Sequence, residues 1–96
     1  MTDVFEALAS PARRAVLDEL REKDGQTLFE LCSRLAMKCG LGMSRQAISQ
    51  HLDVLESVGL VKTERQGRYK FHYIDTEPLR AIVQRWPIQG GGGVAR

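Results

Sequence analysis

The spacing of apolar residues changes once along the chain, and this change constrains the fold more than any other feature. Up to Val58, apolar residues recur every three or four positions, which is helical spacing. After Gly59, two short segments rich in β-branched and aromatic residues follow, separated by Gln66-Gly67-Arg68. A glycine in so short a link is typical of a tight hairpin turn. We therefore expect a mainly α-helical domain that carries a two-stranded antiparallel hairpin.

The boundaries of the elements follow from capping residues, prolines and glycines. Ser10 before Pro11, and Thr27 before an apolar stripe, are typical N-caps, while Gly59 is a plausible left-handed C-cap. We expect five helices, over about 3–8, 11–23, 28–37, 45–58 and 77–86, and strands over 60–65 and 69–74. The chain of 96 residues suits one domain over 1–88, followed by a flexible Gly-rich tail over 89–96.

The helix that begins after Ser44 has two chemically distinct faces. Its apolar face carries Ala47, Ile48, His51, Val54, Leu55 and Val58, with Leu52 at the margin, and the opposite face carries Arg45, Gln46, Ser49, Gln50 and Asp53. Solvated helix faces are usually rich in Glu and Lys, which the first two turns lack, whereas Arg, Gln and Ser match the base edges of a major groove. We interpret this face as a DNA-reading surface, with the candidate base-reading residues Ser44, Arg45, Gln46, Ser49 and Gln50. His51 is expected to face the core.

Basic residues are concentrated in the middle of the chain. Residues 31–70 contain seven Lys or Arg residues against three acidic residues, although the net charge of the whole chain is only +2. Several of them lie near the hairpin turn, where they are suited to holding phosphates or entering a minor groove. Our candidates for contacts with the DNA backbone are Thr27, Arg65, Gln66, Arg68 and Lys70. His72, on the strand face opposite Tyr69, Phe71 and Tyr73, is also expected near the DNA.

Three segments in series resemble one known family. Residues 9–17 (ASPARRAVL), 47–61 (AISQHLDVLESVGLV) and 65–73 (RQGRYKFHY) look like the opening, the recognition helix and the wing of bacterial transcriptional regulators of the ArsR/SmtB type. The resemblance covers about residues 4–86. It implies a winged helix-turn-helix fold and a homodimer that binds an imperfect palindrome in double-stranded DNA and represses until a signal releases it. The segment 38–43 is longer than the turn usual in that family.

The first and last helices carry the apolar residues that we expect to pair two copies of the chain. Left uncovered, they form a larger apolar surface than a small monomer exposes. Two recognition helices held about 34 Å apart then reach successive major grooves. The alternative is that these residues complete the core of a monomer. The expected interface residues are Val4, Phe5, Leu8, Leu79, Ile82, Val83 and Trp86.

The sequence offers little for a metal site, a redox switch or an enzyme. Zinc or arsenic sites need three or four converging ligands, whereas the chain has two separated thiols, Cys32 on an apolar stripe and Cys39 in the expected turn. No phosphate-binding glycine loop or nucleophile motif occurs. We expect no cofactor and no metal, no membrane partner, an unknown effector and a cytoplasmic location. Two alternatives remain: a thiol- or metal-responsive sensor on the same fold, and a winged-helix module that binds another protein.

Overall fold

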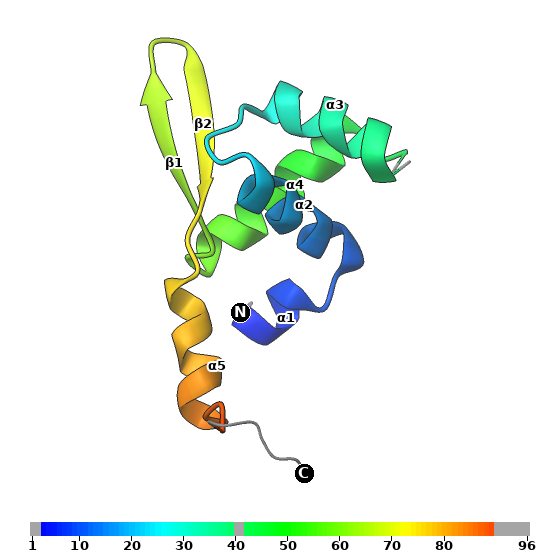
Figure 1. Cartoon of the computed structure of the whole chain (residues 1–96). Helices are drawn as coiled ribbons and strands as arrows, with labels where there is room; N and C mark the ends of the chain where they lie inside the picture. Colours follow the sequence, from blue (N-terminus) through cyan, green and yellow to red (C-terminus); the bar gives the residue numbers. More distant parts are fainter. Residues whose placement is uncertain (1–2, 40–41, 90–96) are drawn as a thin grey trace.

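The computed structural model of the chain describes residues 3–39 and 42–89, and Figure 1 shows their arrangement. The predicted winged helix-turn-helix fold is confirmed, because the described part contains five α-helices, a short 3-10 turn and a two-stranded antiparallel hairpin. In chain order the elements are α1 (Val4–Leu8), α2 (Pro11–Glu22), α3 (Leu28–Cys39), α4 (Arg45–Ser57), β1 (Val61–Gln66), β2 (Tyr69–Ile74), η1 (Glu77–Leu79) and α5 (Arg80–Arg85).

Two boundaries differ by more than one residue from those that the sequence predicts. α3 continues to Cys39 rather than ending near Met37, so Cys39 belongs to a helix and not to a turn. The last helical segment begins as the 3-10 turn η1, and Thr76 makes no side-chain capping bond there. Residues 40–41 of the predicted turn and residues 90–96 of the predicted tail lie outside the described residues.

The core lies where α2, α3 and α4 pack together over the base of the hairpin. Its fully buried members are Ala7, Val16, Leu20, Leu31, Leu35, Ile48, Leu52, Leu55, Leu60 and Val61. Leu52, which the sequence pattern places at the margin of the apolar face, is only 3% exposed. Because α4 packs against both other helices and against β1, its buried face is wider than a single apolar stripe.

A buried carboxylate with two partly exposed cationic partners fixes α3 against α2. Glu19 of α2 is 4% exposed and accepts a hydrogen bond from Nε of Arg34 at 2.6 Å, while Nζ of Lys38 lies 3.2 Å from its other oxygen. Burial would raise the pKa of this carboxyl, but the hydrogen bonds and positive charges of Arg34 and Lys38 outweigh it and lower the pKa. The first helix of the helix-turn-helix pair is therefore held in place by charge as well as by apolar packing.

The end of α4 sets the direction of the hairpin. Gly59 adopts φ +82°, and the amides of Gly59 and Leu60 bond to the carbonyls of Glu56 and Leu55 at 3.0 Å each. This is the Schellman arrangement, in which a left-handed residue lets the last carbonyls of a helix find donors. The predicted glycine cap is thus confirmed, and it turns the chain directly into β1.

α5 lies apart from the helical bundle, at the other end of the molecule from the hairpin tip and beside α1 (Figure 1). Phe5 and Trp86 meet edge to face, with ring centroids 6.2 Å apart. Among the helices of the described residues, none combines the length and the apolarity that a bilayer-spanning segment requires.

Candidate DNA-binding interface

α4 presents its polar face to solvent. Ser44 caps the helix, since its Oγ accepts a hydrogen bond from the amide of Ala47 at 3.1 Å. Arg45, Gln46 and Gln50 are exposed and Ser49 is half-buried, while Ile48 on the opposite side is fully buried. The capping oxygen of Ser44 is already engaged, so of the five predicted base-reading residues it is the least available to a base.

An open cleft of about 500 Å³ lies between the N-terminal end of α3, the polar face of α4 and the hairpin; we call it the α4–wing cleft. It brings together five of the residues that the sequence predicts for DNA contacts: Thr27, Arg45, Ser49, Arg68 and Lys70. The other candidates (Ser44, Gln46, Gln50, Arg65 and Gln66) do not line it. Gln46 and Gln50 lie farther around α4, and the exposed Arg65 and Gln66 lie on β1 beside the hairpin turn.

Like charges face each other across the hairpin near its tip. Arg65 and Lys70 are direct partners in the antiparallel register, so their side chains share one face of the hairpin. Such a pair is unfavourable unless an anion lies nearby. Arg68 is also exposed, and it follows Gly67, which adopts φ +60° in the hairpin turn. The tip is therefore a cationic projection suited to phosphate.

Thr27 has a structural role that the sequence also predicts. Its Oγ1 accepts a hydrogen bond from the amide of Glu30 at 3.2 Å, and its own amide donates to Oε1 of Glu30 at 3.0 Å. This reciprocal pair is a capping box at the start of α3. The backbone hydrogen bond from Thr27, joined by Lys23, lowers the pKa of Glu30. Thr27 is half-buried at the edge of the cleft.

His72 lines the α4–wing cleft, on the same face of β2 as Lys70, but it is almost fully buried there. It is 6% exposed, its Nδ1 lies 2.9 Å from the carbonyl of Gln26, and the backbones of the two residues form an isolated antiparallel bridge. The fully buried Gln26 donates from its side chain to the carbonyl of Lys23 at 2.7 Å. These bonds attach β2 to the link between α2 and α3 and so fix the hairpin relative to the cleft.

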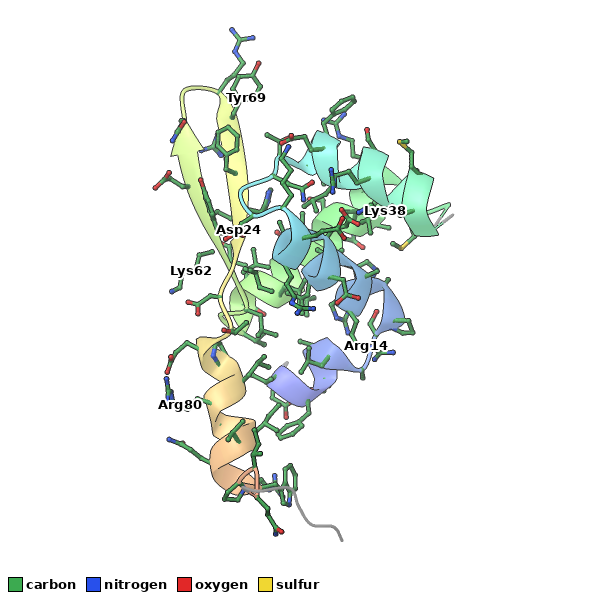
Figure 2. All side chains as sticks on the ribbon, viewed as in Figure 1. Arg14, Asp24, Lys38, Lys62, Tyr69 and Arg80 are labelled. Atoms are coloured by element: carbon green, nitrogen blue, oxygen red, sulfur yellow. The ribbon has the colours of Figure 1, made fainter. Side chains whose placement is uncertain are left out.

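A second bond supports the same attachment. The carboxylate of Asp24 accepts from the amide of Ile74 at 2.8 Å, and Figure 2 shows Asp24 beside the hairpin with Tyr69 near its tip. Asp24 and Gln26 belong to a polar link whose sequence carries no periodic signal, so the sequence pattern does not indicate these contacts.

Besides His72 and the apolar Leu28 and Leu52, four further residues line the cleft: Phe29, Asp53, Glu56 and Tyr69. Phe29 lies off the apolar stripe of α3 in the sequence, and it is 68% exposed. Its place off the apolar stripe is the only feature of the sequence that indicates that Phe29 lies outside the core. Tyr69 is also exposed and lies against Phe71, with ring centroids 6.3 Å apart.

The cysteines and acidic residues do not form a metal centre in the part of the chain that the structure describes: no three His, Cys, Asp or Glu side chains converge there. Cys32 is half-buried, and burial raises the pKa of its thiol, although the charge of Arg45 acts in the opposite direction. The thiolate that would bind a metal or react with an oxidant is therefore disfavoured at this position.

The predicted dimer residues fall into two groups. Val4, Leu8 and Leu79 are half-buried against the core, as the monomer alternative requires, and Ile82 is also half-buried. In contrast, the exposed fractions are 45% for Phe5, 42% for Val83 and 57% for Trp86. These three side chains leave apolar and aromatic surface on one side of α1 and α5.

Comparisons with known proteins agree with this arrangement. A family model described as a helix-turn-helix domain matches residues 8–64. The chain is 45% identical over 83 residues to the uncharacterized HTH-type transcriptional regulator YuzN of Bacillus subtilis, covering 86% of this chain and 90% of YuzN. It is 32% identical over 81 residues to the HTH-type transcriptional repressor SmtB of Mycobacterium tuberculosis, covering 84% of this chain and 55% of SmtB.

Among solved structures, an ArsR family transcriptional regulator, RHA00566, superposes with a TM-score of 0.69 at 33% identity, over 84% of this chain and 76% of that one. The family and the fold are those of DNA-binding transcriptional regulators and not of enzymes. With the α4 face and the cationic wing in place, the chain belongs to the ArsR/SmtB-type family of winged helix-turn-helix transcriptional regulators.

Proposed function

We propose that the chain is a homodimeric, sequence-specific repressor that binds an imperfect palindrome in double-stranded DNA and has no built-in metal-sensing site. The observation that carries the proposal is the α4–wing cleft, in which the polar face of α4, with Arg45 and Ser49, adjoins a cationic hairpin. A helix of this kind fits a major groove, and the basic hairpin fits the phosphates beside it.

The residues divide into two roles. Arg45, Gln46, Ser49 and Gln50 read base edges, because their donors and acceptors are exposed or border the cleft. Ser44 contributes mainly by holding the start of α4. The wing residues Arg65, Gln66, Arg68 and Lys70, with Thr27 at the start of α3, contact the sugar–phosphate backbone and fix the register without reading sequence.

The homodimer follows from the surface that α1 and α5 leave uncovered. Phe5, Val83 and Trp86 would remain in water in a monomer, and burying such side chains stabilises by about 25 cal/mol per Å² of apolar surface. A twofold pair places two α4 helices on successive major grooves about 34 Å apart. The name of SmtB as a repressor supports repression as the mode of control.

Selection of bound duplexes from a random oligonucleotide pool tests the proposal. We expect a palindromic consensus whose half-site spacing is close to one or two helical turns. Arg45→Ala and Gln50→Ala should each reduce discrimination between the consensus and its variants by about 1–3 kcal/mol, with non-specific binding largely retained. Arg21→Ala, which removes an exposed positive charge from α2 outside the cleft, is the matched control.

Two outcomes would contradict the proposal. A wild-type chain that enriches no sequence is not a specific regulator, and its α4 face is then a candidate surface for another protein. Loss of DNA binding on adding zinc or a mild oxidant, abolished by Cys32→Ser or Cys39→Ser, would instead support a thiol- or metal-responsive sensor.

A further inference from the structure

Asp53 places a negative charge in the cleft that is otherwise suited to a polyanion. It is exposed, and it lines the α4–wing cleft together with Arg45 and Ser49. At about 100° per residue, Asp53 lies only about 40° around the helix from Ser49 and about 60° from Gln50. It therefore lies in the middle of the polar face of α4, one helical turn beyond Ser49.

Within the part of the chain that the structure describes, no salt-bridge partner accounts for this carboxylate. The salt bridges found among residues 3–39 and 42–89 do not include Asp53. Glu56, the other acidic residue of the cleft, accepts a hydrogen bond from Oγ1 of Thr63 at 3.2 Å. Glu56 thus braces α4 against β1, whereas Asp53 is exposed in the lining of the cleft and remains available to whatever enters it.

The chemistry of the major groove restricts what can meet those oxygens. An ionised carboxylate only accepts hydrogen bonds. Guanine presents two acceptors in the groove and thymine one, while adenine presents a donor beside an acceptor; cytosine presents only its N4 amino donor. Phosphates repel the carboxylate by charge. The exocyclic amino group of cytosine is the partner that satisfies Asp53 without placing another acceptor against it.

We propose that Asp53 is a specificity-determining residue that selects cytosine at one position of each half-site. The inference rests on the proposed DNA-reading function of α4 and extends the reading surface into the third turn of the helix. It also gives Asp53 a second effect, since the charge weakens binding to every duplex that does not offer the amino group.

The experiment compares the selected sequences and the affinities of the wild type with those of Asp53→Asn and Asp53→Ala. The control is Asp18→Asn, in which an exposed aspartate of α2 loses the same charge outside the cleft. In the wild type, replacing the preferred cytosine should weaken binding by between about five- and 150-fold. Asp53→Ala should lose that preference and bind non-specific DNA more tightly. Asp53→Asn should shift it towards adenine, because an amide donates and accepts. Asp18→Asn should keep the cytosine.

The outcomes separate this inference from the function on which it rests. A wild-type consensus that survives unchanged in both Asp53 variants overturns the inference and leaves sequence-specific regulation intact. A wild type without any consensus overturns both. Circular dichroism of each variant verifies that these surface substitutions leave the fold in place.

Discussion

Arg13 of α2 reaches across to His51 of α4, with its Nη1 3.3 Å from Nδ1 of the imidazole. Because a guanidinium only donates, Nδ1 must accept, and the ring proton lies on Nε2. The same guanidinium donates from Nε to the carbonyl of Ala7 at 2.8 Å and from Nη2 to the carbonyl of Glu6 at 3.0 Å. One side chain therefore joins three helices and provides donors for the exposed carbonyl end of α1.

Substitution of Arg13 should loosen α1 from the bundle. Lysine lacks the planar fork that serves three acceptors at once, so Arg13→Lys should lower the free energy of unfolding by about 1–3 kcal/mol in urea denaturation. Arg21→Lys, on the exposed side of the same helix, is the control and should change stability little. Equal stability of both variants would show that the contacts of Arg13 contribute nothing net.

His51 should make stability depend on pH. Burial, followed by the charge of Arg13, lowers the pKa of His51 in the folded chain below its usual value near 6.5. The unfolded chain therefore takes up the proton first, and the contribution of neutral His51, full above about pH 6.5, is lost as pH falls through the folded pKa. Urea midpoints should fall between about pH 7 and pH 5 in the wild type.

His51→Asn supplies the matched control for that dependence. Its Oδ1 can occupy the place of Nδ1 and accept from Arg13, but it does not titrate. The fall in stability with acidification should therefore be shallower in this variant. Parallel pH curves for the two proteins would assign the effect to other groups.

The sequence predicts the elements of the fold better than the contacts that orient them. Ser10, Thr27, Ser44 and Gly59 act through the backbone within a few residues, so local patterns identify them. His72 shows the limit of that approach. Strand alternation correctly places it opposite the aromatic residues, but only the contact with Gln26, 46 residues earlier in the chain, determines that the His72 side chain itself is buried.

The same limit applies to the interface. Helical periodicity separates the polar side of α4 from the core side, whereas the residues that meet it across the cleft come from α3 and β2. Phe29 and Tyr69 could not be placed there without the tertiary arrangement. The exposure of Phe5 and Trp86 is likewise a property of how α1 and α5 lie together.

Removal of the buried carboxylate between α2 and α3 should be costly. Glu19→Gln keeps the shape but removes the buried anion of Arg34 and Lys38, and a loss of about 1–3 kcal/mol in unfolding free energy is expected because both cations remain partly exposed and keep the exposed carboxylate of Glu22. The lowered pKa of Glu19 adds stability that is present above about pH 4.5 and lost as pH falls further, so the variant should lose less on acidification. Glu22→Gln, at a more exposed partner of Lys38, is the control.

The wing should contribute salt-dependent affinity and no sequence preference. If Arg68 contacts a phosphate in each half-site, Arg68→Ala should reduce the slope of log K against log salt by about one per contact, or about two for a dimer. The ranking of operator variants should stay the same. Fluorescence anisotropy over a range of salt concentrations measures both, with Arg21→Ala as the control. A slope equal to that of the wild type would exclude a phosphate contact at Arg68.

Disruption of the α1–α5 surface should separate the two copies without unfolding either one. Val83 lies on α5 and is 42% exposed, so a carboxylate there is solvated in a monomer but buried in the proposed dimer. Val83→Asp should therefore sediment as a monomer at concentrations at which the wild type is a dimer, and its circular dichroism should be unchanged. Operator affinity should fall steeply, because each half-site is then bound alone.

Met37→Glu, at an exposed apolar position on α3, adds a similar charge elsewhere and should leave the dimer intact. A wild type that is already monomeric at tens of micromolar would refute the proposed pairing, whereas a dimeric Val83→Asp variant would move the interface away from α5.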